Sequence, residues 1–166
     1  MSMEWLLARV PGLANLPAED IAAILSFTFL WSLFEAKVMA CNATADTISA
    51  KVDQWRDAGT LDAEQYGAEL AYFRARYFEN GAFTDRFSGL KLKPSNQPAV
   101  VQSVLDATNN DARDRLFTTL MIVLRFRNNL FHGEKWAYEI QDQRPNFIHA
   151  NSVLMRLLDR HWPLGV

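Results

Sequence analysis

A compact group of polar residues follows a long apolar stretch and includes the side chains of this chain best suited to chemistry. The apolar stretch runs from Leu116 to Leu124 and is interrupted only by two threonines. Arg127, Asn128 and His132 come next, where a helix should still be half buried. A buried polar group costs free energy unless it is paired, so these residues form either a satisfied network or a site. Their types and spacing favour a site.

The three side chains offer proton transfer and the binding of an anion. Histidine exchanges protons near neutral pH, so His132 can serve as base and as acid. Its place at the C-terminus of a helix favours the protonated imidazole, whereas a nearby Arg127 opposes it. The guanidinium of Arg127 is a planar fork of donors that matches phosphate oxygens. The amide of Asn128 is placed to hydrogen-bond His132 and hold its ring in orientation.

The helical spacing leaves three arrangements of this group open. Asn128 and His132 are four residues apart and share one face of a helix. Arg127 and His132 are five apart, about 140° around the axis, so they do not stack on an ideal straight helix. Either the last turn loosens at Asn128-Asn129, or the arginine side chain reaches round. The third arrangement has two copies of the motif facing each other across a two-fold axis.

The string from Arg125 to Gly133 contains the pattern Arg-Asn-x-x-x-His. This pattern resembles the signature of the HEPN superfamily, and the string is similar to that of stand-alone bacterial members. The apolar segment Trp31-Ser32-Leu33-Phe34-Glu35 is also similar to the long first helix of some of these proteins. The resemblance implies a small helical bundle and a metal-independent endoribonuclease that acts as a toxin or host-defence effector.

The resemblance also implies the residues and partners of that activity. Arg127, Asn128 and His132 would be catalytic, and the product would carry a 2′,3′-cyclic phosphate. The substrate would be RNA, because DNA lacks the 2′-hydroxyl nucleophile. The implied partners are a second copy in a homodimer and a cognate antitoxin or nucleotidyltransferase. No cofactor is expected, because the sequence contains no glycine-rich phosphate loop and no cysteine pair.

Two residues near this group have two interpretations each. Asn129 is either a further member of the network, in reach of substrate, or a helix-terminal group. Glu35 either neutralises Arg127 from the long apolar helix or is the solvated end of that helix. Arg125 is expected to form a surface ion pair.

Four further residues are candidates for contact with substrate or for ordinary packing. Lys135 is placed where it could contact a phosphate, and Trp136 where it could contact a base. Aromatic stacking on bases is common in single-stranded RNA binding. The alternative for Trp136 is half-buried packing. His149 and His161 have no arranged neighbours in the sequence and are treated as ordinary.

The bulk composition bounds the class of protein. The 166 residues are most simply one domain over 1–166. Hydrophobic residues make up 49% of the chain and charged residues 22%, as is typical of a folded globular protein. A net charge of −2 argues against nucleic-acid binding by bulk electrostatics. It supports a second hypothesis, a catalytically silent helical module that binds RNA or protein. A third hypothesis is a structural domain in which the polar group ties helices together.

The location is predicted to be cytoplasmic. Cys41 is the single cysteine and cannot form an internal disulfide, which suits a reducing compartment. No secretory signal is recognised at the N-terminus. The most membrane-like stretch, Ile21 to Phe34, is shorter than the roughly 18–20 residues that span a bilayer and is interpreted as a core helix.

Apolar residues recur at helical spacing along most of the chain, and no run alternates with a period of two. The pattern predicts an all-α bundle of five or six helices, HEPN-like and expected as a two-fold dimer in view of two helices with no polar face in so small a chain. The expected helices are one capped by Asn15 and ending near Ala40, and others over 47–58, 62–80, 98–108, 111–131 and 146–162, while any helix before Pro11 would be short. Gly81 is expected to cap the helix before it, and 82–98 to be the longest loop.

Overall fold

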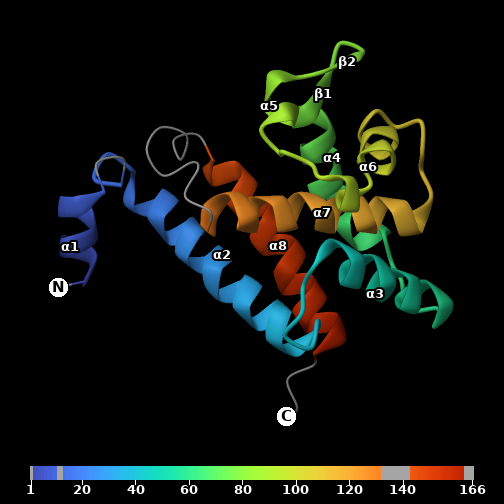
Figure 1. The fold of residues 1–166 in the computed structure, drawn as a ribbon, viewed down its shortest axis with the longest axis horizontal. Coiled ribbons are helices and arrows are strands. Elements are labelled where there is room, and N and C mark those ends of the chain that lie inside the picture. The colour runs from blue at the N-terminus through green and yellow to red at the C-terminus, as the bar shows by residue number, and fades with distance from the viewer. Residues whose placement is uncertain (1, 11–12, 132–142, 163–166) are drawn as a thin grey trace.

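The computed structural model describes residues 2–10, 13–131 and 143–162, which form an all-α bundle (Figure 1). The predicted fold class is therefore confirmed. The α-helices among the described residues are α1 (Ser2–Arg9), α2 (Ala18–Lys37), α3 (Ala45–Asp57), α4 (Gly67–Tyr77), α5 (Asp85–Ser88), α6 (Pro98–Leu105), α7 (Ala112–Phe131) and α8 (Arg144–His161). The described residues also form two 3-10 turns, η1 (Glu64–Tyr66) and η2 (Pro94–Asn96), and a hairpin of β1 (Phe78–Glu79) and β2 (Ala82–Phe83).

Helix α7 crosses the middle of the bundle (Figure 1). Every residue from Leu116 to Phe126 is buried, so this part of the helix has no wet face. The two threonines of the run are fully buried, and the Thr119 hydroxyl donates to the carbonyl of Arg115 at 2.9 Å. That bond pairs a buried hydroxyl within the helix itself. The apolar run thus makes α7 the core around which the other helices pack.

Helices α2 and α8 lie side by side and run in the same direction (Figure 1). Arg144 pairs with Glu19 at 2.7 Å where both helices begin. The rings of Phe27 and Phe147 have centroids 5.2 Å apart. The predicted core helix is present, since α2 buries Ile24, Phe27, Trp31 and Phe34. Among the described residues, no helix has the length and apolar character needed to span a bilayer.

Helix α3 packs beside α7 and buries Ile48, Val52 and Trp55. Arg113, near the start of α7, donates from Nε to Asp53 of α3 at 2.9 Å. It begins after Thr44, whose hydroxyl accepts from the Thr47 amide at 3.2 Å in a capping box. Such a cap satisfies an amide that the first turn leaves unpaired.

The structure differs most from the predicted elements between residues 78 and 98. The helix expected to reach Asn80 ends at Tyr77, and the chain turns into the hairpin. The φ angles of Asn80 and Gly81 are 52° and 78°. Both are positive, as in a type I′ turn, so Gly81 shapes a hairpin and not a helix cap. The predicted loop after it contains β2, α5 and η2.

The expected cap of α2 is also wrong. Pro17, and not Asn15, occupies the position before the helix. Proline has its φ angle fixed near the helical value and lacks an amide proton, so it suits the entry to a helix without a side-chain cap.

Candidate functional site

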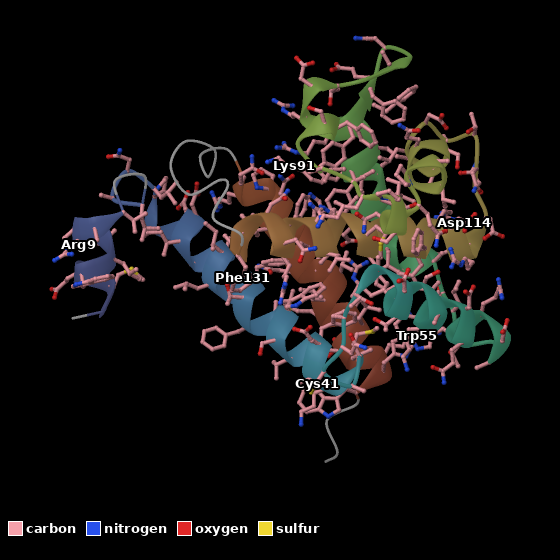
Figure 2. All side chains as sticks on the ribbon, in the orientation of Figure 1. Arg9, Cys41, Trp55, Lys91, Asp114 and Phe131 are labelled. Atoms are coloured by element: carbon pink, nitrogen blue, oxygen red, sulfur yellow. The ribbon has the colours of Figure 1, made fainter. Side chains whose placement is uncertain are left out.

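The last turn of α7 is where the central helix leaves the core. All residues from Leu116 to Phe126 are buried, whereas Arg127 and Asn128 are half-buried and Phe131 is 54% exposed. Figure 2 labels Phe131 at this end of α7. The apolar run thus delivers polar side chains to the surface at the position where the sequence places the motif.

Arg127 lies between the amide of Asn128 and the ring of Phe131. One terminal nitrogen, Nη1, donates to Oδ1 of Asn128 at 3.2 Å, and the guanidinium carbon lies 5.3 Å from the centroid of the Phe131 ring. Its Nε is buried without a hydrogen-bond partner among the described residues. None of the carboxylates that the structure describes lies within 4.0 Å of it. The guanidinium is therefore held by Asn128 at one edge and by the Phe131 ring at one face, and no described carboxylate neutralises its charge.

Many other arginines have a carboxylate partner within the described residues. Ion pairs are formed by Arg56, Arg113, Arg115, Arg144, Arg156 and Arg160. The arginines that share with Arg127 the lack of a described carboxylate within 4.0 Å are Arg9, Arg74, Arg76 and Arg86. Arg76 and Arg86 both lie near Tyr77, where they oppose the rise that burial gives to the pKa of its hydroxyl. Apart from Arg9 in α1, these unmatched arginines lie in α4, α5 and α7.

Asn129 faces the opposite way from Arg127 and is used internally. Its Nδ2 donates to the carbonyl of Gly89 at 3.1 Å, and its Oδ1 accepts from Nη2 of Arg125 at 3.4 Å. Nε of Arg125 donates to the carbonyl of Leu90 at 2.8 Å. Arg125 is 5% exposed, so the prediction that it lies at the surface is wrong. Arg125 and Asn129 fasten the end of α7 to the segment that follows α5.

Glu35 lies at the C-terminal end of α2 and not beside Arg127. Its carboxylate accepts from Nε1 of Trp31 at 3.3 Å and from the amide of Ala43 at 3.4 Å. Of the two interpretations offered for Glu35, neutralisation of Arg127 has no contact to support it among the described residues. The carboxylate instead holds the chain where it leaves α2.

Three predicted site residues lie outside the described residues: His132, Lys135 and Trp136. The structure therefore brings together Arg127 and Asn128 of the predicted catalytic group. The relation of His132 to them stays a prediction. The three arrangements that the helical spacing left open stay open as well.

Two histidines treated as ordinary do have arranged neighbours. His161 stacks on Trp55 with ring centroids 4.0 Å apart, and His149 stacks on Tyr72 at 3.9 Å. Burial lowers the pKa of His161 to about 4, and the charge of Arg160 nearby adds to the effect. Burial also lowers the pKa of His149. No local spacing signals these stacks, because each partner is distant in the sequence.

A shallow hollow of about 500 Å³ is lined by Gln65, Arg156, Asp159 and Arg160. Its arginines are already occupied, since Arg156 pairs with Glu69 at 3.2 Å and Arg160 with Asp62 at 3.6 Å. The hollow lies toward the C-terminal end of α8. The end of α7 instead packs near the start of α8, where the rings of Phe126 and Phe147 have centroids 6.3 Å apart. The hollow is therefore separate from Arg127.

No group of three or more His, Cys, Asp or Glu among residues 2–10, 13–131 and 143–162 is arranged to hold a metal ion. Comparison of the chain with models of protein families, with curated proteins and with solved structures gave no match.

Proposed function

We propose that this chain is a metal-independent endoribonuclease that acts as a toxin or host-defence effector through Arg127, Asn128 and His132. The observation that carries the proposal is the guanidinium of Arg127, which has no described carboxylate and rests against Asn128 and Phe131. A charged fork held in place beforehand stabilises a phosphate better than a free one, because less motion is lost on binding. Arg127 would bind the scissile phosphate.

The contacts refine the role of Asn128. Its Oδ1 accepts from Arg127, so Asn128 would orient the guanidinium. No other hydrogen bond of the Asn128 side chain occurs within the described residues, so Nδ2 would serve the imidazole or the substrate. This assignment extends the sequence-based one, in which Asn128 served His132 alone.

The proposed reaction needs only proton transfer and charge stabilisation. His132 takes the proton of the ribose 2′-hydroxyl, and the 2′-oxygen forms a bond to phosphorus. The bond from phosphorus to the 5′-oxygen breaks, and that oxygen leaves with a proton. One fragment ends in a 2′,3′-cyclic phosphate and the other in a 5′-hydroxyl. Arg127 would stabilise the charge that grows on the phosphorane oxygens.

The test is cleavage of single-stranded RNA by the full chain in EDTA. We expect fragments ending in a cyclic phosphate, and a loss of rate of about 10²–10³ in Arg127→Ala, the range for removal of one stabilising donor. His132→Ala should abolish cleavage. Arg56→Ala is the matched control, because Arg56 is an exposed arginine paired with Asp53 at 3.3 Å. Equal cleavage by the wild type and His132→Ala would refute the proposal.

The alternative function is a silent helical module that binds RNA or a protein. Intact RNA that nevertheless binds the chain would favour it. Control by an antitoxin or a nucleotidyltransferase is part of the first proposal, and the same assay tests it when the candidate partner is added. The homodimer expected from the sequence needs a separate measurement of mass in solution.

A further inference from the structure

Helix α2 has an exposed face that carries no charge. Between Asp20 and Lys37 the exposed residues are Ala22, Leu25, Ser26, Phe29, Ser32, Leu33 and Ala36, and we call these the outer face of α2. Phe29 is 71% exposed, Leu25 45% and Leu33 39%. Exposed apolar side chains gathered in one stripe mark an interaction surface more often than scattered ones do.

The outer face has the same order of residues in both directions. Read along the helix it is Ala, Leu, Ser, Phe, Ser, Leu, Ala, with Phe29 at the centre. The spacings are equal on the two sides as well, because Ser26 and Ser32 lie three residues from Phe29, Leu25 and Leu33 four, and Ala22 and Ala36 seven. In a two-fold contact, residue i of one chain meets residue j of the other and j meets i, so two α2 helices crossing antiparallel at Phe29 would pair leucine with leucine and serine with serine.

We infer that the outer face of α2 is the contact surface of a two-fold homodimer in which the two α2 helices run antiparallel and cross at Phe29. Leu25 of one chain would face Leu33 of the other, and the alanines at the ends would let the helices approach closely. This inference concerns assembly alone and does not depend on the nuclease proposal.

The charges at the ends of α2 favour the antiparallel direction. Glu19 and Asp20 lie at the N-terminal end, where Arg144 of the same chain pairs with Glu19 and leaves an excess of one negative charge, and Lys37 lies at the C-terminal end. An antiparallel pair places each acidic end near the basic end of the other chain, and it also opposes the helix dipoles. A parallel pair would bring like charges together.

The size of the outer face suits a moderately stable dimer. Its seven side chains offer on the order of 500 Å² per chain, so a dimer would bury about 1,000 Å² in total, near the lower limit of specific interfaces.

The dimer would keep the two motif sites apart. Phe27 lies on the core side of α2, about 160° around the helix from Phe29. The ring of Phe147 in α8 contacts both Phe27 of α2 and Phe126 near the end of α7. The core side of α2 therefore adjoins the end of α7. The outer face of α2 therefore points away from the side of the helix that adjoins Phe126, and we do not expect this interface to build one site from two motifs.

The first test is the mass of the full chain in solution, measured by light scattering from low to high micromolar concentration. We expect the mass to approach twice the 18.9 kDa of one chain for the wild type. Phe29→Asp should stay at the mass of one chain, with an unchanged circular dichroism spectrum because Phe29 is exposed. Ile148→Asp is the control, since Ile148 is a 46% exposed apolar residue on α8 and should leave the dimer intact. A wild-type monomer at the highest concentration overturns the inference, and so does a Phe29→Asp dimer.

The second test fixes the direction of the pair by oxidative cross-linking in a Cys41→Ser background. Leu25→Cys mixed with Leu33→Cys should form a disulfide-linked dimer, because the antiparallel pair places these positions opposite each other. Each variant alone should cross-link at least tenfold more slowly. Efficient linking of Leu25→Cys to itself would overturn the antiparallel arrangement. Neither readout uses RNA, so failure here is distinguishable from failure of the nuclease proposal.

Discussion

Asn128 and Asn129 are adjacent in the sequence, but their side chains have different environments. Asn128 is half-buried and bonds to Arg127, whereas Asn129 is 7% exposed and joins Arg125 to the carbonyl of Gly89. On the helix, successive residues point about 100° apart, which separates the outward amide from the inward one. One neighbour is therefore free to act in a site, and the other stabilises the fold.

This difference predicts unequal effects on stability. Asn129→Ala should lower the free energy of unfolding by about 1–3 kcal/mol, because it removes a partner of the buried Arg125 guanidinium and of the Gly89 carbonyl. Asn128→Ala should change it by no more than about 0.5 kcal/mol, the range for surface changes. Helix propensity favours alanine equally in both variants and cancels in the comparison. Urea denaturation followed by circular dichroism measures the two, and equal losses would contradict the assignment.

The sequence predicts the position of the motif but not the environment of each member. The end of the apolar run marks where α7 leaves the core, so the partial exposure of Arg127 follows from the pattern. The partners of Arg125 and Asn129 include the carbonyls of Leu90 and Gly89, which any residue type would supply. A bond to a distant backbone group leaves no trace in residue types, so nothing in the sequence signals that Arg125 is buried.

At the scale of elements, the spacing of apolar residues predicts the long apolar helices, but it does not predict the segment around the hairpin. Helices α2 and α7 carry apolar residues over many turns, and tertiary packing only reinforces that signal. Strands of two residues each are too short to show alternation, so the helical pattern before Asn80-Gly81 masks the hairpin. The Asn-Gly pair itself is a strong hairpin signal and could have identified it.

The contact between α3 and the end of α8 gives the fold a dependence on pH. His161 stacks on Trp55, and its pKa in the folded chain is about 4, below the ordinary value of 6.5. The unfolded chain therefore takes up the proton first as the pH falls. The stability from the neutral imidazole is complete above about pH 6.5 and is lost as the pH falls toward about 4.

The loss between pH 7 and pH 4 is predicted to be about 1–3 kcal/mol from this residue, allowing for its partial exposure. In His161→Gln the difference between the free energies of unfolding at the two pH values should be smaller by that amount. Carboxylates titrate in both proteins and cancel in the comparison. Urea denaturation at the two pH values measures it. An unchanged difference in His161→Gln would show that the stack does not control the titration.

At the scale of the whole molecule, the charge is divided unevenly along the chain. Residues 1–69 contain four Lys or Arg and ten Asp or Glu, a net charge of −6, whereas residues 70–131 contain nine and five, a net charge of +4. The total of −2 conceals this division, and the sequence-based argument against a basic face rested on the total. Among the arginines without a described carboxylate, Arg74, Arg76, Arg86 and Arg127 belong to the positive part, and Arg9 does not.

The division makes Arg86 a candidate phosphate contact for single-stranded RNA if the nuclease proposal holds. Each phosphate contact contributes about −0.7 to the slope of log K against the logarithm of salt concentration for a single strand. Arg86 is exposed, lies in the positive part and has no described carboxylate within 4.0 Å. Arg86→Ala should therefore make the slope shallower by about 0.7. Arg56→Ala removes the same charge from the negative part, where Asp53 and Asp57 pair with it, and should leave the slope unchanged.

Fluorescence anisotropy with 2′-O-methyl RNA, which lacks the nucleophile, measures binding without cleavage. Equal slopes for the two variants would mean that the backbone of the RNA does not pass over α5.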